Sequence, residues 1–192
     1  MEKSEIQEKL QSYFSVIEEG SLNAIVKHSS FLKSIKGTKL ISEGERHHYI
    51  YLIIKGSVKS YYSKDSKDSK EVCVWFSLEN EIIGTTSTIQ GDTSKETIEL
   101  LEDSELIKLN IEKIKELTQT DLSISNVLNS LWEEHATFIE ERLYQLQFMN
   151  SQERYKALIK DNPEILQRVS LTDIASFLGV SRETLSRIRA KN

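Results

Sequence analysis

Residues 170–192 read SLTDIASFLGVSRETLSRIRAKN, and this segment predicts the structure of the end of the chain. It predicts a first helix over residues 171–178, because Ser170 can cap this helix and apolar residues recur on one of its sides. Gly179 supplies the positive φ that a tight turn needs, and Ser181 caps a second helix. This spacing is typical of a helix-turn-helix, and a plain helical hairpin is the alternative.

The two predicted helices bury one side against each other and expose the other. Their buried side is expected to hold Ile174, Leu178, Val180, Leu185 and Ile188. On the exposed side, an arginine can donate two hydrogen bonds to guanine O6 and N7, and a glutamate can accept one from cytosine N4. Hydroxyl groups and the helix N-terminus can contact phosphate. The residues expected to bind DNA are Ser181, Arg182, Glu183, Thr184, Ser186, Arg187, Arg189 and Lys191.

The charge of the chain is unevenly distributed. The 192 residues carry a net charge of −5 at pH 7, which is unusual for a nucleic-acid-binding protein. However, residues 151–192 contain eight Lys and Arg against five Asp and Glu, whereas residues 1–150 contain 17 against 25. The basic charge is therefore concentrated around the predicted helix-turn-helix.

No stretch of the chain reads as a membrane or export segment. The apolar runs are shorter than the roughly 18–20 residues that span a bilayer, and the charged start MEKSEIQEKL lacks the apolar centre of a signal peptide. We therefore expect a cytoplasmic protein without a membrane partner.

A long helix is predicted from about Asp121 to Met149. This stretch contains no Gly or Pro, and its apolar residues recur three, four and seven positions apart. At about 1.5 Å per residue the helix is about 40 Å long. It can join two subunits, and the alternative is a single helix that covers a sheet. The residues expected at a dimer interface are Leu128, Leu131, His135, Phe138 and Arg142.

The first half of the chain changes from a helical to a β pattern. Residues 1–36 are expected to be helical, because apolar residues recur there at helical spacing. Residues 38–109 contain short β-rich runs such as YIYLII, separated by Gly or by charged clusters. Residues 63–70, SKDSKDSK, are expected to form an exposed hairpin tip. Many short strands predict a sandwich, roll or barrel.

The order of these parts, together with SRETLSRI at residues 181–188, resembles the Crp/Fnr family of bacterial transcriptional regulators. The resemblance covers nearly the whole chain. It implies a β-roll, a long helix that builds a parallel homodimer, and a recognition helix in which Arg182, Glu183 and Arg187 read base edges. Gly44, Lys55-Gly56 and Gly84 look like turn glycines of the family.

The sequence departs from the family pattern at the phosphate-binding cassette. The family has Gly-Glu and then Arg-Ser/Thr, whereas here Gly84 precedes Thr85, and Lys95 and Glu96 occupy the later positions. A cyclic nucleotide needs a carboxylate for its ribose and a cationic fork for its phosphate. We therefore expect these four residues to mark an effector pocket that is not gated by cyclic AMP. The chain ends at Asn192, so the C-terminal wing of some relatives is expected to be absent.

Other chemistry is weakly indicated. The single cysteine, Cys73, lies in the apolar run VCVWF and is expected to be buried. The sequence contains no nucleophile–base pair, Walker loop or metal motif, so no catalysis, cofactor or metal site is expected. His47 and His48 are expected to be solvated loop residues. A haem or redox sensor of the same family, using Cys73 and a histidine, is one alternative.

The sequence thus predicts an α+β protein with three parts. These are a cyclic-nucleotide-binding-like β-roll sensor (1–118), a long dimerisation helix (119–150) and a helix-turn-helix DNA-binding domain (151–192). We expect a homodimeric regulator that binds a near-palindromic operator, with an unknown small-molecule effector and RNA polymerase as further partners. A regulatory module that binds small molecules and acts through protein contacts is the other alternative.

Overall fold

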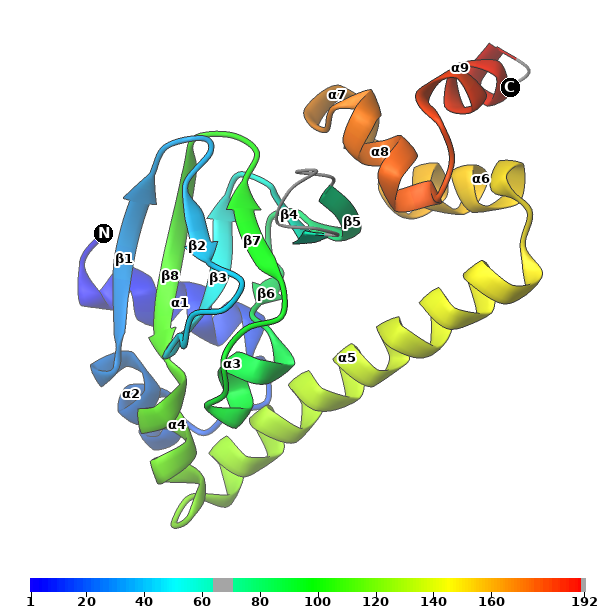
Figure 1. The fold of residues 1–192 in the computed structure, drawn as a ribbon. Helices are drawn as coiled ribbons and strands as arrows, with labels where there is room; N and C mark the ends of the chain where they lie inside the picture. Colours follow the sequence, from blue (N-terminus) through cyan, green and yellow to red (C-terminus); the bar gives the residue numbers. More distant parts are fainter. Residues whose placement is uncertain (64–70, 191–192) are drawn as a thin grey trace.

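Two antiparallel sheets form the centre of the N-terminal half of this computed structural model, which describes residues 1–63 and 71–190 (Figure 1). The first sheet has the strand order β1-β8-β3-β6, and the second has the order β2-β7-β4-β5. The strands are β1 (Ser29–Ser34), β2 (Lys39–Ile41), β3 (Tyr49–Lys55), β4 (Val58–Ser63), β5 (Glu71–Ser77), β6 (Ile82–Ile83), β7 (Thr97–Leu100) and β8 (Ser104–Asn110). The predicted β-roll is confirmed, and the expected hairpin tip lies almost wholly outside the described residues.

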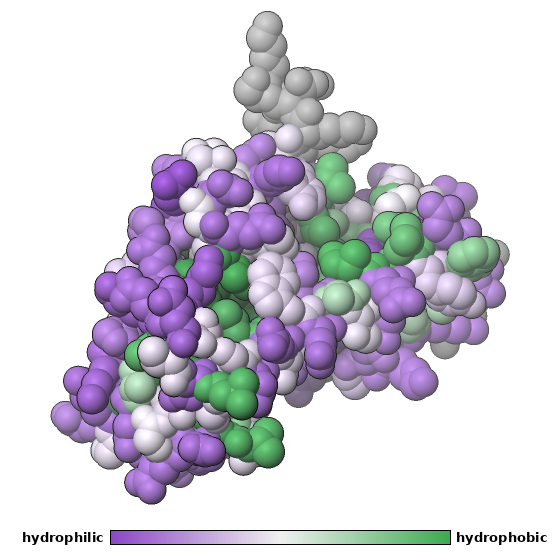
Figure 2. All heavy atoms as spheres, turned by 90° about the horizontal axis from the view of Figure 1, so that it is seen from below, coloured by the Kyte–Doolittle hydropathy of each residue, from purple (hydrophilic) through white to green (hydrophobic). Residues whose placement is uncertain are grey.

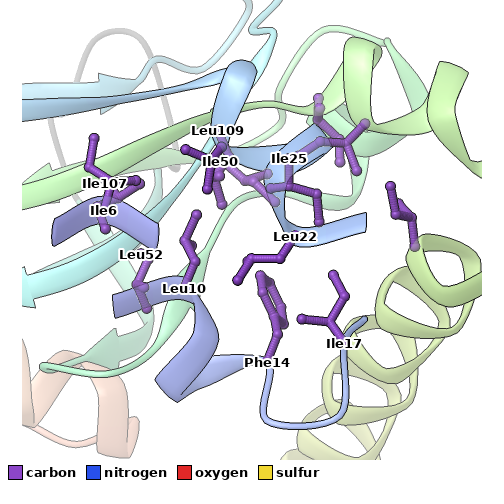
Figure 3. Packing of buried hydrophobic residues seen from close by; sticks show 14 residues of the cluster. Ile6, Leu10, Phe14, Ile17, Leu22, Ile25, Ile50, Leu52, Ile107 and Leu109 are labelled. Atoms are coloured by element: carbon purple, nitrogen blue, oxygen red, sulfur yellow. The ribbon is translucent and has the colours of Figure 1, made fainter. Parts of the chain in front are cut away.

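Strand β3 is buried on both of its faces, which explains its continuous apolar run. Tyr51 and Ile53 point into the cluster between the two sheets, together with Leu106 of β8. Ile50 and Leu52 point the other way, into a cluster with α1 (Lys3–Tyr13) and α2 (Glu19–Lys27) (Figure 3). Successive side chains of a strand alternate between faces, so a strand covered on both sides must be apolar throughout.

The expectation that residues 1–36 are helical is wrong at its end. The chain turns into β1 at Ser29, and β1 pairs with β8 over its whole length, from Ser29–Leu109 to Ser34–Ser104. Two short helices follow later, α3 (Thr86–Gln90) and α4 (Ile111–Thr118). Helix α3 has no apolar period in the sequence that would reveal it.

Helix α5 (Leu122–Phe148) has 27 residues and confirms the predicted long helix. The side chain of Asp121 caps it by accepting a hydrogen bond from the backbone N–H of Ile124, 3.1 Å away. The helix leads away from the β-roll to the C-terminal helices (Figure 1). Over the described ranges, no helix is both long and apolar enough to cross a membrane.

Four further helices form the C-terminal unit, and one of them covers the edge of a sheet. They are α6 (Ser151–Asp161), α7 (Ile165–Arg168), α8 (Leu171–Leu178) and α9 (Arg182–Ala190). Strand β5 lies at the end of its sheet, and α8 packs along it. The Ser176 hydroxyl accepts a hydrogen bond from Cys73 N–H (3.0 Å) and donates one to the Glu71 carbonyl (3.2 Å). The rings of Phe76 and Phe177 pack 5.4 Å apart.

Arg168 of α7 binds two loops of the β-roll at once. Its guanidinium donates to both carboxylate oxygens of Glu79 (2.7 Å each) and to Glu102 (2.6 Å). The backbone N–H of Gly56 donates to Glu79 (2.8 Å), which fixes this carboxylate from the other side. The hydrogen bonds from Arg168 hold the pKa of Glu79 down at about 2.

Replacing Arg168 with Met is expected to lower the free energy of unfolding by about 1–3 kcal/mol, because two partly buried carboxylates lose their partner. Glu79 ionises below its unfolded pKa, so the difference from wild type is complete above about pH 4.5 and disappears as the pH falls towards 2. Urea unfolding at several pH values measures this. The control Lys33→Met removes the exposed pair with Glu105, which is worth under about 1 kcal/mol. Equal losses for both variants contradict the assignment.

Gly56 is expected to tolerate no side chain. Its φ is +116°, and an added Cβ would lie 2.1 Å from the Ser104 hydroxyl oxygen. Gly56→Ala should lower the free energy of unfolding by at least about 2 kcal/mol, through backbone strain and overpacking. Gly20, in the first turn of α2, has open space around it, so Gly20→Ala should stabilise the fold by about 0.5–1 kcal/mol. Thermal unfolding of the two variants measures both effects. A Gly56→Ala protein as stable as the wild type contradicts the prediction that position 56 tolerates no side chain.

Candidate functional site

Helices α8 and α9 meet through a short turn and share a buried apolar side. Ser170 caps α8 by accepting a hydrogen bond from Asp173 N–H (3.1 Å), and Gly179 ends this helix with a φ of +69°. Of the five residues predicted on the shared side, Ile174, Leu178, Leu185 and Ile188 are buried, and Val180 is half-buried. The two predicted helices and their turn are therefore where the sequence places them.

The N-terminus of α9 is capped by a side chain. The Ser181 hydroxyl accepts a hydrogen bond from the backbone N–H of Thr184 at 3.2 Å. Glu183 lies in the first turn, where its own backbone N–H and then the Ser181 hydroxyl lower the pKa of its carboxyl group. This carboxylate therefore stays ionised at neutral pH.

The polar residues of α9 form one exposed face. Thr184 is half-buried, and Lys191 lies outside the described residues. The exposed members of the predicted set are Ser181, Arg182, Glu183, Ser186, Arg187 and Arg189. This face presents three guanidinium groups and one carboxylate within nine residues.

Two other arginines hold α8 in place. Arg154 of α6 donates to the Leu178 carbonyl (3.0 Å) at the end of α8. Arg142 of α5 donates to the Phe177 carbonyl, and its guanidinium lies 3.9 Å from the centre of the Phe177 ring. Cations at the C-terminus of a helix stabilise it. Arg142 thus binds within its own chain, a role that the sequence reading missed because the two segments lie 35 residues apart.

The four residues of the cassette are split between two places. Gly84 and Thr85 line a cleft of about 310 Å³ between the β-roll and α5, whereas Lys95 is exposed and Glu96 lies outside the lining. The Thr85 hydroxyl caps α3 by accepting a hydrogen bond from Thr88 N–H (3.0 Å). Thr85 is therefore already engaged in the fold.

Glu96 is partly buried behind the cleft. Its carboxylate accepts hydrogen bonds from the Ser60 hydroxyl and from Trp75 Nε1 (3.1 Å). Burial raises the pKa of Glu96, and these two hydrogen bonds oppose the rise. A carboxylate in this position repels a phosphate group.

Four of the five residues predicted at a dimer interface make contacts within their own chain, and the fifth, Phe138, lines the cleft. Leu128 and Leu131 pack against the hydrophobic core around α1 and α2, and Arg142 binds Phe177 as described. His135 shares a hydrogen bond with the Thr86 hydroxyl at 3.2 Å. Leu131, His135 and Phe138 line the cleft.

The cysteine and the paired histidines have structural partners. Cys73 is buried in the contact between β5 and α8, and burial raises the pKa of its thiol. It does not line the cleft that His135 lines. His47 accepts a hydrogen bond from Ser42 N–H (2.9 Å), and His48 lies 2.8 Å from a Glu112 oxygen. Within the described residues, no three His, Cys, Asp or Glu side chains are grouped to hold a metal ion.

Comparison with known proteins identifies the fold. Residues 33–121 match the model of the cyclic nucleotide-binding domain, and no curated protein matches the chain significantly. FixK2 from Bradyrhizobium japonicum is 20% identical with a TM-score of 0.75, covering 85% of this chain and 83% of its own. A protein from Eubacterium rectale, described as a Crp/Fnr-family transcriptional regulator, is 17% identical with a TM-score of 0.73, covering 94% and 87%.

A third solved structure extends the same likeness. The global regulator CLP of Xanthomonas campestris, described as responsive to c-di-GMP, is 22% identical with a TM-score of 0.69 and covers 91% of each chain. At these identities the likeness establishes the fold. The chain therefore contains a cyclic nucleotide-binding domain at residues 33–121 and has the overall fold of the Crp/Fnr family of transcriptional regulators.

Proposed function

We propose that the protein is a homodimeric, cytoplasmic transcriptional regulator that binds a near-palindromic DNA site through α9. The observation that carries the proposal is the exposed face of α9, where Arg182, Glu183 and Arg187 stand above a buried apolar side. Arg142 and Arg154, in contrast, are bound to backbone carbonyls of α8. The arginines of α9 are thus available for a partner, whereas Arg142 and Arg154 are not.

The side chains of α9 suit the edges of base pairs in a major groove. An arginine can bind guanine O6 and N7 with two hydrogen bonds, and an ionised glutamate can accept one from cytosine N4. The hydroxyl of Ser181 and the backbone N–H groups beside it favour a phosphate, which would fix the register of the helix on the duplex. Arg182, Glu183 and Arg187 are therefore proposed as base-reading residues.

Dimerisation is proposed through an exposed apolar stripe of α5, a revision of the interface expected from the sequence. The stripe contains Ala136, Ile139, Leu143 and Leu146, spaced alternately three and four residues apart. Ile139, Leu143 and Leu146 are each about half exposed, at 48%, 57% and 50%. On the face drawn in Figure 2, hydrophobic residues (green) are exposed at several places between hydrophilic ones. This spacing is that of the a and d positions of a coiled coil, and a second α5 can bury the stripe.

Regulation is proposed to act through the contact between β5 and α8. This contact combines hydrogen bonds of Ser176, the ring contact of Phe76 with Phe177, and the ion pair of Lys59 with Asp173 (3.2 Å). An effector that shifts β5 would release or reposition α8 and thereby change the distance between the two α9 helices of a dimer. Cyclic AMP is not the proposed effector, because Thr85 and Glu96 are unsuited to it.

The alternative functions make different predictions. A module that acts through protein contacts would show no salt-dependent affinity for DNA. A haem sensor would show a Soret band, but Cys73 is buried against α8. Contact with RNA polymerase is proposed only as a consequence of DNA binding.

Arg182→Ala and Arg187→Ala are each expected to weaken binding to a selected DNA site by about 1–3 kcal/mol and to relax the preference at one base pair of each half-site. The half-sites should lie about one helical turn, 10–10.5 base pairs, apart. Mobility-shift titrations on selected and scrambled sites, at several salt concentrations, measure both effects.

Lys36→Ala is the control for this experiment. Lys36 is exposed on the β-roll and far from α9 in the sequence, and the substitution removes one positive charge, as the arginine substitutions do. It should leave the discrimination between sites unchanged. If the wild-type protein binds selected and scrambled sites equally, α9 does not read bases and the proposed function fails.

Ile139→Glu combined with Leu143→Glu is expected to convert the dimer into a monomer, because two carboxylates would face their counterparts across the seam. Sedimentation velocity measures the change. Thr137→Glu adds a carboxylate to the same helix outside the stripe and should leave the dimer intact. A doubly substituted protein that still sediments as a dimer excludes this interface.

A further inference from the structure

The cleft between the β-roll and α5 is lined by five aromatic side chains together with five aliphatic ones. Its volume of about 310 Å³ is in the lower part of the range for small-molecule pockets. The chain has two tryptophans, and both line the cleft. The aromatic lining consists of Tyr13, Trp75, Phe76, Trp132 and Phe138.

The ionisable side chains of the cleft are two glutamates, Tyr13 and His135. Glu81 and Glu134 are in the lining, which contains no Lys or Arg. The Tyr13 hydroxyl donates to Glu134 at 3.5 Å. Burial, followed by the charges of Glu134 and Glu81, raises the pKa of Tyr13 to about 12, so both carboxylates lie near this hydroxyl. Neither glutamate forms an ion pair within the described residues.

The acidic character continues outside the cleft. A shallower groove along α5 shares Glu134 and Phe138 with the cleft and adds Glu133 and Glu141. These four glutamates along α5 and the cleft favour the approach of a cation over that of an anion.

Within the described residues, no Lys or Arg side chain lies over an aromatic ring of the cleft. Cationic side chains lie over four rings of the described residues, those of Phe31, Tyr49, Tyr61 and Phe177. None of these four rings is in the cleft. Aromatic faces grouped with carboxylates are the arrangement that recognises quaternary ammonium groups.

We propose that this cleft binds an organic cation with an apolar or aromatic body, such as a quaternary ammonium compound. Its charge would be balanced by Glu81 and Glu134, and its body would pack on Trp75 and Trp132. The inference rests on the proposed function only in taking this cation to be the effector, because the binding itself needs no DNA.

The position of the cleft suits an effector site. Trp75 and Phe76 belong to β5, the strand that holds α8, and Trp132 belongs to α5. Phe76 also contacts Phe177 of α8 directly. A ligand between Trp75 and Trp132 therefore touches β5, the strand whose contact with α8 carries the proposed regulation, and α5, the helix of the proposed dimer interface.

The test is a titration of the full-length protein followed by tryptophan fluorescence. The probe is benzyltrimethylammonium, with neopentylbenzene as its neutral isostere and cyclic AMP as the anion. We expect a saturable change with the cation, affinity about tenfold weaker for the neutral isostere, and no binding of cyclic AMP. Equal or tighter binding of the isostere or of cyclic AMP overturns the proposal, as does a lack of response to the cation.

Variants locate the site. Glu134→Gln and Trp132→Leu should each weaken binding of benzyltrimethylammonium about fivefold or more, with Trp75 reporting in the second variant. Glu140→Gln removes an exposed carboxylate of the same helix that does not line the cleft, and should have no effect. Circular dichroism confirms that each variant is folded. Unchanged affinity in Glu134→Gln and Trp132→Leu would overturn the assignment.

The two proposals fail separately. Titrations of Arg182→Ala should give wild-type affinity for benzyltrimethylammonium, because α9 is not part of the cleft. If the cation binds normally but the protein does not discriminate between DNA sites, only the proposed function is wrong.

Discussion

The exposed edge of β5 is the constraint on which the arrangement of the two halves depends. A strand at the end of a sheet leaves backbone N–H and C=O groups without partners, and such an edge invites aggregation unless it is covered. Here α8 covers it, and the Ser176 hydroxyl bonds both to Cys73 N–H and to the Glu71 carbonyl. The chain leaves the β-roll along the 27 residues of α5 and returns through α6 and α7 to this edge. The position of α8, and with it that of α9, therefore depends on a β-strand as well as on the arginines of α5 and α6.

Charged side chains contribute much of this contact, which affects how it can change. Lys59 is only 8% exposed and pairs with both Glu71 and Asp173, while Arg168 joins Glu79 to Glu102. Partly buried ion pairs add little net stability, but breaking one of them leaves a charge without its partner. We therefore expect this contact to form and to be released as a unit. This behaviour suits a two-state element better than a purely apolar interface would.

Local signals in the sequence predicted the helices and strands well. Contacts between residues far apart in the sequence were not predicted. The caps at Ser170 and Ser181 and the turn at Gly179 are encoded within a few residues, so the last two helices were placed correctly. Strand β1 was missed because its partner β8 begins 75 positions after it, and nothing in SSFLKS itself indicates that pairing. The apolar period of α5 indicated a buried face, but it did not indicate whether a second subunit or a sheet covers this face. Arg142 was therefore predicted at a dimer interface, and its contact with Phe177 was not predicted.

A β-bulge in β5 connects the candidate cleft to the C-terminal unit, and no pattern in the sequence predicts this bulge. In the pairing of β5 with β4, Ser60 lies opposite Trp75 and Tyr61 lies opposite Cys73. Val74 therefore has no partner in β4 and is the extra residue of a β-bulge. Without the bulge, Cys73 and Trp75 would point to the same face of the sheet. In the structure, Cys73 is buried in the cluster with α8, whereas Trp75 lines the cleft and bonds to Glu96. Phe76 contributes to both, because it lines the cleft and packs against Phe177. In the proposed regulation, Phe76 would pass a change of packing in the cleft directly to Phe177 of α8.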